Sequence, residues 1–286
     1  MAGQAYHAGV LSALADSGWD PGSAEVIVGT SAGSITAALL RAGVAPSAMA
    51  SGSYRSMQGA GRAAAPEAAE MAAAAALVTG ATSGRASVGG QLSRLVPAGR
   101  TSPGGIITMV RRVAGDGWPG RATWICAVRR SDGRRIVFGR EGAPEVPQSL
   151  AVAASCAIPG FFTPVTIDGQ AYVDGGAHSP TTLDLLAGLG LDALVVSSPM
   201  SVSRTGIGRR LDLPVRMVFR ATLAREVRAA RRAGTPVLTL QPTDEDLQAM
   251  GLNAMDPRPW AQVVRSARAS TRRRLEDPAV GRLLTG

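Results

Sequence analysis

The segment EVIVGTSAGSITAALL, residues 25–40, joins an apolar run to an alanine-rich run through the small residues GTSAG. The first run is typical of a short buried strand and the second of a helix that ends at Gly43. Where a strand turns this abruptly into a helix, β-carbons beside the serine have no space, and its hydroxyl is lifted out of the fold. We therefore predict that Ser31 is a nucleophile; the alternative is a small residue in a tight turn.

The predicted turn also offers a place for negative charge. A helix that begins near Ala32 points its free backbone N–H groups, and the positive end of its dipole, toward Ser31. Such groups stabilise an alkoxide or a tetrahedral oxyanion. Gly29, Ala32 and Gly33 therefore complete a predicted nucleophile elbow, whose G-x-S-x-G pattern occurs once in the sequence.

A serine hydroxyl reacts well only when a base takes its proton. In YVDGG, residues 172–176, Asp174 ends a predicted strand, and Gly175 and Gly176 let another backbone or a substrate come close. Partial loss of solvent weakens the preference of an aspartate for its charged form and makes it a better proton acceptor. We therefore predict that Asp174 is the base; the alternative is a solvated carboxylate in an Asp-Gly-Gly turn.

His178, four residues after Asp174, is a second candidate for the base. Ser31, Asp174 and His178 follow the chain order of the triad in α/β-hydrolases. In that fold, however, several strands precede the nucleophile, and the aspartate reaches the histidine from a separate loop. A carboxylesterase or acyltransferase that uses His178 is therefore the alternative to a direct pairing of Ser31 with Asp174.

Strand and helix patterns alternate at both ends of the chain, and Asp132-Gly133 and Asp168-Gly169 mark the turns of two hairpins between them. This order predicts an α/β fold with a mostly parallel central sheet that helices cover on both faces. Residues 5–15 are predicted to be a helix in which His7 is an ordinary packed residue.

No domain boundary is evident, so we expect a single domain over residues 1–286. It carries an insertion rich in alanine and glycine at about 57–120, which we predict to be helical. We expect the apolar residues of this insertion to pack onto the sheet, with a lid that meets a lipid surface as the alternative. These residues are Ile106, Ile107, Met109 and Val110.

The composition excludes several classes of enzyme. All 30 Lys+Arg residues are arginines, so the lysine that P-loop proteins, pyridoxal enzymes and Ser-x-x-Lys hydrolases need is missing. The two histidines and two cysteines are too few and too scattered for a zinc site. Cys126 lies in a strand-like run, and we predict a buried, reduced thiol there.

The net charge of +9 and the pI near 11.1 favour anionic partners. We predict solvated helix faces for two arginine clusters, with contact to an anionic membrane surface as the alternative. They consist of Arg228, Arg231 and Arg232, and of Arg272, Arg273 and Arg274. Because aromatic residues make up only 4% of the chain, we expect no nucleic-acid partner.

No segment reaches the roughly 20 apolar residues that span a bilayer. We therefore predict a cytoplasmic protein whose contact with a membrane is at most peripheral. A noncatalytic, arginine-rich protein that binds membranes or nucleic acid is a third hypothesis, beside the two kinds of serine enzyme.

With Ser31 in a G-x-S-x-G elbow and Asp174 in a D-G-G, the chain resembles the bacterial patatin-like phospholipases. GQAYHAGVLSAL, residues 3–14, is similar to the helix after that family's glycine-rich loop, and ASCAIPGFFTPVTIDGQAYVDGG, residues 154–176, to its approach to the catalytic aspartate. The resemblance implies a three-layer patatin-like fold and a Ser-Asp dyad that cleaves phospholipid or other lipid esters through an acyl-enzyme. It implies no metal and no organic cofactor.

The chain departs from this family at its beginning. Family members normally begin with a strand and a run of glycines whose N–H groups form the oxyanion hole, whereas this sequence starts at MAGQAY, just past that run. Gly3 matches only the last glycine of the loop. Loss of one oxyanion donor costs roughly a hundredfold in rate, so we expect a misassigned start, with an impaired enzyme as the alternative.

Overall fold

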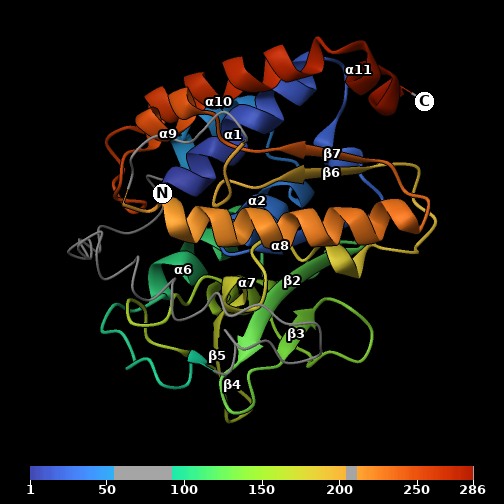
Figure 1. Cartoon of the computed structure of the whole chain (residues 1–286). Coiled ribbons are helices and arrows are strands. Elements are labelled where there is room, and N and C mark those ends of the chain that lie inside the picture. The colour runs from blue at the N-terminus through green and yellow to red at the C-terminus, as the bar shows by residue number, and fades with distance from the viewer. Residues whose placement is uncertain (55–91, 204–210, 286) are drawn as a thin grey trace. The chain divides into compact units, whose positions relative to one another are not determined.

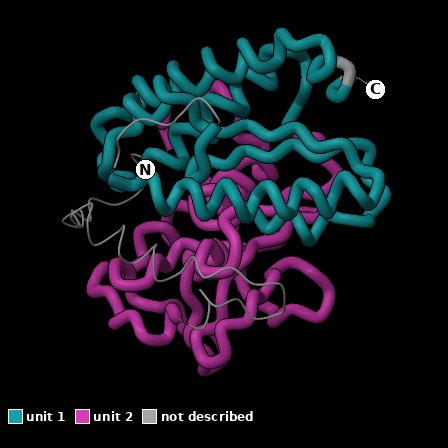
Figure 2. The backbone as a smooth tube through the Cα atoms, viewed as in Figure 1, with its two compact units in different colours: residues 1–21, 181–286 teal, residues 22–180 magenta. Residues whose placement is uncertain are grey.

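The computed structural model describes residues 1–54, 92–203 and 211–285. The chain divides into two compact units (Figure 2), of which unit 1 comprises residues 1–21 and 181–286 and unit 2 comprises residues 22–180. Ser31 and Asp174 both belong to unit 2. Residues 57–91 of the predicted insertion lie outside the described residues.

Unit 2 is built on a five-stranded sheet (Figure 1). Its strands are β1 (Ile27–Thr30), β2 (Thr123–Arg129), β3 (Arg135–Phe138), β4 (Val165–Ile167) and β5 (Gln170–Asp174). β2 is the central strand, because it pairs with β1, β3 and β5, while β4 pairs with β5. The middle of β2, from Ile125 to Val128, is fully buried, which explains its continuous apolar sequence.

The strands β1 and β5 lie one after the other along the same edge of β2. A strand residue pairs with at most one neighbour on each side. Ile125 pairs with both β1 and β3, and Ala127 pairs with both β5 and β3. β3 therefore occupies one edge of β2, and β1 and β5 share the other. Because β1 is parallel and β5 antiparallel to β2, their carboxyl ends point toward each other.

The α/β class is confirmed, but the sheet of unit 2 is mixed rather than mostly parallel. Only β1 and β2 form a parallel pair in it, and the pairs β2–β3, β2–β5 and β4–β5 are antiparallel. The two predicted hairpins account for the pairs β2–β3 and β4–β5, and the pair β2–β5 joins the first hairpin to the second. At the second one, Asp168 and Gly169 have φ values of 47° and 72°, as a two-residue type I′ turn requires.

The helices of unit 2 pack on this sheet and on each other. α2 contacts β1 and β2, α7 contacts β2, β4 and β5, and α6 packs on α2 and α7. Met109 and Val110 of α6 are fully buried, and Ile106 and Ile107 are half-buried. This described part of the insertion therefore packs inside the unit, but mainly on α2 and α7 and not, as expected, on the sheet. The elements are η1 (Pro21–Ser23, which begins in unit 1), α2 (Ala32–Arg41), α3 (Pro46–Ser51), α6 (Gly104–Ala114), α7 (Gln148–Ser155) and η3 (Gly175–Ala177).

Unit 1 contains a parallel strand pair with its crossover helix. β6 (Leu194–Ser197) and β7 (Val237–Leu240) pair in parallel, and α8 (Leu213–Arg232) lies between them in sequence. Such a pair needs a long connection that crosses over the sheet. Val196, Leu223 and Val237, one from each element, belong to one buried cluster. The other elements are α1 (Ala2–Asp16), η4 (Leu183–Leu185), α9 (Asp244–Met250), α10 (Trp260–Leu275) and α11 (Pro278–Thr285).

α1 packs closely along α10 in unit 1. At Gly9, a β-carbon would lie 2.5 Å from the carbonyl oxygen of Val264, so the approach requires glycine. Two residues before Gly9, α1 carries His7, whose Nδ1 lies 2.8 Å from the Ser197 hydroxyl. Burial lowers the pKa of His7 to about 4. His7 is therefore a packed, neutral residue, which confirms the prediction.

Among the helices of the described residues, none combines the length and the apolarity that crossing a bilayer requires. Cys126 and Cys156 are buried free thiols, as predicted for Cys126.

Candidate active site

Ser31 and Asp174 meet where the two strands on one edge of β2 end. Thr30, the last residue of β1, pairs with Cys126, and Asp174, the last residue of β5, pairs with the next residue, Ala127. Ser31 directly follows Thr30 and therefore emerges opposite the end of β5. The fold thus brings together the two residues that the sequence analysis singled out as nucleophile and base.

The backbone turns sharply at Ser31. This residue has φ 53° and ψ −122°, a conformation that an L-residue adopts only under strain. The strand and the helix on either side also approach each other closely. A β-carbon at Gly29 would lie 2.6 Å from the carbonyl oxygen of Gly33 and equally far from the Cα of Ser34. The glycine before the serine is therefore sterically required, as the elbow pattern predicts.

Hydrogen bonds hold the Ser31 backbone on both sides. Its N–H donates to the hydroxyl of Ser155 over 2.9 Å. Its carbonyl oxygen accepts from the N–H and the hydroxyl of Ser34, at 2.9 and 2.7 Å, and from the Cys156 thiol at 3.2 Å. The Ser31 N–H is thus occupied, whereas Ala32 opens α2 and its N–H has no acceptor within the helix. Of these two groups, the Ala32 N–H is the one suited to bind an oxyanion.

The Asp174 carboxylate is buried and directly paired with Ser31. It accepts hydrogen bonds from the Ser31 side chain and from the Gly176 N–H, the latter over 2.7 Å. Burial raises the pKa of Asp174 to about 6, although both hydrogen bonds act to lower it. A carboxylate with this pKa is a stronger base than a solvated one and is still largely ionised at neutral pH. The alternative of a solvated Asp-Gly-Gly turn is therefore wrong.

The two glycines after Asp174 have separate roles. A β-carbon at Gly175 would lie 2.3 Å from the carbonyl oxygen of Cys126 and 3.0 Å from the Thr30 side chain. The backbone that comes close there is therefore that of β2 and of the end of β1. Gly176 supplies the N–H that bonds the carboxylate. Both glycines thus serve to fit Asp174 into the corner between β1 and β2.

His178 and Gly3 are the remaining predicted site residues. His178 follows η3, and its N–H donates to the carbonyl of Gly175 over 2.9 Å. The hydrogen bonds that act on the Asp174 carboxylate come from Ser31 and Gly176, so the contact between serine and aspartate needs no imidazole between them. Gly3 lies in the first turn of α1, in unit 1. Its oxyanion role stays a prediction.

Sequence reasoning did not identify Ser155 and Cys156, which hold the backbone of Ser31. Both are buried at the end of α7, in the segment ASCAIPG. Small residues such as these are common in buried helices. The sequence offered one signal: a serine and a cysteine stand side by side at the end of an apolar helix. A short segment then leads to the hairpin that carries Asp174.

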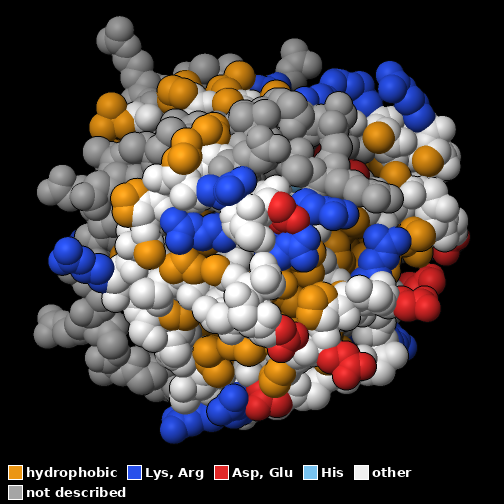
Figure 3. Space-filling model, turned by 90° about the horizontal axis from the view of Figure 1, so that it is seen from below, with side chains coloured by type: hydrophobic (Ala, Val, Ile, Leu, Met, Phe, Trp, Pro, Cys, Tyr) orange, Lys and Arg blue, Asp and Glu red, His pale blue; other side chains and the backbone are white. Residues whose placement is uncertain are grey.

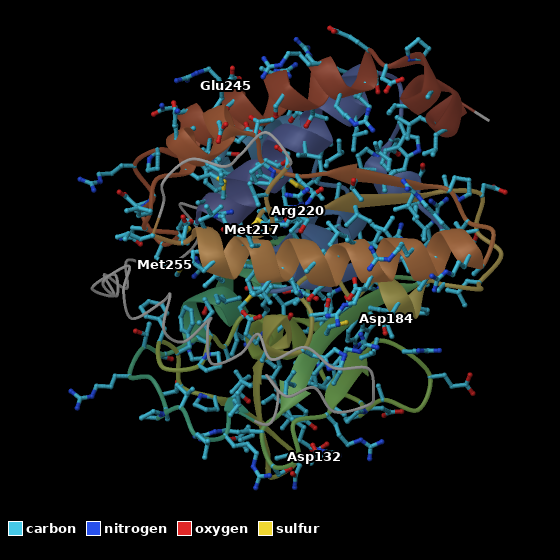
Figure 4. All side chains as sticks on the ribbon, viewed as in Figure 1. Asp132, Asp184, Met217, Arg220, Glu245 and Met255 are labelled. Atoms are coloured by element: carbon cyan, nitrogen blue, oxygen red, sulfur yellow. The ribbon has the colours of Figure 1, made fainter. Side chains whose placement is uncertain are left out.

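The arginine clusters differ in their pairing. Arg272, Arg273 and Arg274 are bonded to Asp16, Glu245 and Asp277, respectively, as expected for solvated helix faces; Glu245, on α9, is labelled in Figure 4. Arg231 donates to the carbonyl oxygen of Val237. On the face drawn in Figure 3, basic side chains (blue) lie next to hydrophobic (orange) and acidic (red) ones.

A comparison with known families places these observations in context. The model of the patatin-like phospholipase family matches residues 1–187, which is more than half of the chain and includes Ser31 and Asp174. No curated protein matches the sequence. Because the family is one of lipid acyl hydrolases, the match supports lipid acyl hydrolase activity in general, and the predicted resemblance is confirmed.

Proposed function

Because this chain belongs to the patatin-like phospholipase family, we propose that it is a serine hydrolase that cleaves phospholipid or other lipid acyl esters through Ser31 and Asp174. The observation that carries this proposal is the hydrogen bond from the Ser31 side chain to a buried aspartate whose pKa is about 6. A nucleophile in contact with a base of raised pKa is the arrangement that acyl transfer requires.

In the proposed reaction, Asp174 takes the proton of the Ser31 hydroxyl while Oγ attacks the ester carbonyl carbon. The negative charge that develops on the carbonyl oxygen is stabilised by the Ala32 N–H and the positive end of α2. When the intermediate collapses, Asp174 gives the proton to the leaving alcohol, and the acyl group stays on Ser31. Asp174 then takes a proton from a water molecule that attacks the acyl-enzyme. It returns this proton to Ser31 Oγ as the bond between Oγ and the acyl carbon breaks and the fatty acid leaves.

The proposal is tested by turnover of a short-chain nitrophenyl ester. We expect Ser31→Ala and Asp174→Asn to lower kcat/KM by about a thousandfold or more. Asp168→Asn is the matched control, because it makes the same change in the exposed turn of the same hairpin, where Asn tolerates a positive φ. Turnover equal to wild type in both Ser31→Ala and Asp174→Asn would end the hydrolase proposal.

One further variant distinguishes the Ser-Asp dyad from the alternative enzyme, which uses a Ser-His-Asp triad. Under the dyad proposal, His178→Ala keeps most of the activity, because Asp174 already contacts Ser31. Under the triad alternative, the same variant loses about a thousandfold or more. His7→Asn is the control for the loss of a histidine, since His7 lies in unit 1 and bonds Ser197.

We propose in addition that α8 contacts anionic lipid surfaces. Arg228 and Arg232 are exposed on this helix, and among the described residues neither forms an ion pair. A basic side chain near an anionic bilayer contributes about 1 kcal/mol to binding. The double variant Arg228→Gln/Arg232→Gln should therefore sediment less with phosphatidylserine vesicles. Arg273→Gln/Arg274→Gln, which removes arginines that are already paired, should bind like wild type; equal binding by all three would exclude a role for α8.

A further inference from the structure

The hydroxyl of Ser155 joins the nucleophile to the central strand. It accepts the N–H of Ser31 over 2.9 Å and donates to the carbonyl oxygen of Cys126 over 2.7 Å. Thr30 and Cys126 form the last residue pair between β1 and β2. The Ser155 hydroxyl therefore adds one more link between the two strands, at the point where the backbone turns away at Ser31. Ser155 is completely buried, so loss of its hydroxyl would remove a bond from the Ser31 N–H and from the Cys126 carbonyl oxygen inside the protein, which is costly.

The next two residues extend the same support. The Cys156 thiol donates to the carbonyl oxygen of Ser31 over 3.2 Å. The carbonyl oxygen of Ala157 accepts the backbone N–H of Asp174 over 2.9 Å. Three consecutive residues thus hold both main-chain groups of Ser31 and the N–H of Asp174. α7, which ends at Ser155, packs on β2 and β5, so the support is fixed to the sheet that carries the pair.

We propose that Ser155, Cys156 and Ala157 form a positioning segment, which sets the contact between the Ser31 hydroxyl and the Asp174 carboxylate, and that the Ser155 hydroxyl is its main positioning residue. This inference rests on the proposed function, because it assigns the segment a part in the same site. The Ser31 backbone is strained, with φ 53° and ψ −122°. Such a conformation persists only where surrounding contacts determine it, and the segment supplies two of those contacts.

Two substitutions of Ser155 separate hydrogen bonding from packing. Ser155→Ala removes the hydroxyl. Ser155→Cys fills a similar volume but offers only a weak donor and a weak acceptor. An effect that both variants share is therefore due to the lost hydrogen bonds, and Ser155→Cys suffices if Ser155→Ala does not fold. Ser149→Ala is the matched control, because Ser149 lies on the same helix, is equally buried and bonds Asp116 instead of Ser31.

The first measurement does not depend on turnover. The pKa of Asp174 is followed by NMR titration of protein with 13C-labelled aspartate. The hydrogen bond from Ser31 lowers this pKa, so a displaced Ser31 should leave it higher than in wild type in both Ser155 variants and unchanged in Ser149→Ala. If the pKa equals that of wild type in the Ser155 variants, or rises as much in Ser149→Ala, the inference is overturned.

The second measurement uses the proposed reaction. With the nitrophenyl ester, we expect kcat of both Ser155 variants to fall about tenfold or more, with KM within about twofold, because small displacements of reacting groups have large effects on rate. Wild-type kcat in both variants would overturn the inference even if Ser31→Ala is inactive. If Ser31→Ala instead retains full activity, the proposed function fails, and the pKa of Asp174 still decides whether the segment positions the pair.

Discussion

Thr30 and Asp174, the last residues of β1 and β5, pair with consecutive residues of β2. Because β1 and β5 run in opposite directions, the strand that leads to Ser31 and the strand that ends in Asp174 meet end to end. This relationship brings the partly exposed Ser31 into direct contact with the buried carboxylate of Asp174. The desolvation of the carboxylate and its contact with Ser31 therefore arise from the same feature of the fold. Both have consequences that can be measured.

The activity should depend on the ionisation of Asp174. A general base acts only in its deprotonated form, and burial raises the pKa of Asp174 to about 6. We therefore expect kcat/KM for a nitrophenyl ester to be constant above about pH 7 and to fall tenfold per pH unit well below 6. A pH–rate profile checks this expectation, and an acid limb centred near pH 4 would indicate that Asp174 is not desolvated in the free enzyme.

The same pKa predicts that Asp174 destabilises the fold at neutral pH. The folded state holds the proton more tightly than the unfolded state, so stability is lost as the pH rises from 3.8 to about 6. This difference in pKa corresponds to a loss of about 3 kcal/mol in the free energy of unfolding. Asp174→Asn, which cannot ionise, should therefore gain up to about 3 kcal/mol relative to wild type between pH 4 and pH 7. Urea unfolding at both pH values measures the difference.

Asp168→Asn provides the control for this experiment, because Asp168 is exposed in the hairpin turn. Its stability relative to wild type should change little between the two pH values. If Asp174→Asn behaves in the same way, the carboxylate is not buried in its charged form.

The sequence predicted the parts of the site that depend on local patterns. The elbow at Ser31 and the hairpin that ends in Asp174 each follow from a few neighbouring residues and their turn glycines. The pairing of β5 with β2 depends instead on how a hairpin docks far along the chain, so the mixed sheet was not predicted. Ser155 was missed for a similar reason, because its role arises only from its contact with Ser31.

His7 should make the fold sensitive to acid. Burial lowers its pKa from 6.5 to about 4, so the unfolded state takes up a proton first as the pH falls. Stability is therefore lost between pH 6.5 and about 4, by about 3 kcal/mol. His7→Asn keeps a polar atom near Ser197 and cannot ionise. Its free energy of unfolding should therefore fall less than that of wild type over this pH range. Unfolding by urea across this range tests the prediction, with His178→Asn as the second histidine variant; equal acid sensitivity in His7→Asn and wild type would contradict it.

Gly175 should tolerate no side chain. A β-carbon there would lie 2.3 Å from a backbone oxygen of β2, so the chain beside Asp174 would have to move. We expect Gly175→Ala to cost about 1–3 kcal/mol of stability and to lower kcat about tenfold or more. Gly105→Ala, where a β-carbon in the first turn of α6 would meet nothing within 4 Å, should lower neither quantity, because alanine is at least as favourable as glycine in a helix. Thermal unfolding and ester turnover measure both effects, and wild-type kcat in Gly175→Ala would show that this corner is not rigid.

The strained backbone of Ser31 predicts a difference between two inactive variants. Ser31→Ala and Ser31→Gly both remove the hydroxyl and its bond to Asp174, so that loss cancels when the two are compared. At φ 53° and ψ −122°, alanine retains the strain of an L-residue, about 1–3 kcal/mol, whereas glycine relieves it at an entropic cost of about 0.5–1 kcal/mol. Ser31→Gly should therefore be more stable than Ser31→Ala by about 1 kcal/mol in urea unfolding. If Ser31→Ala is the more stable variant, the turn is relaxed, and the contacts of Ser155 and Cys156 do not hold it against strain.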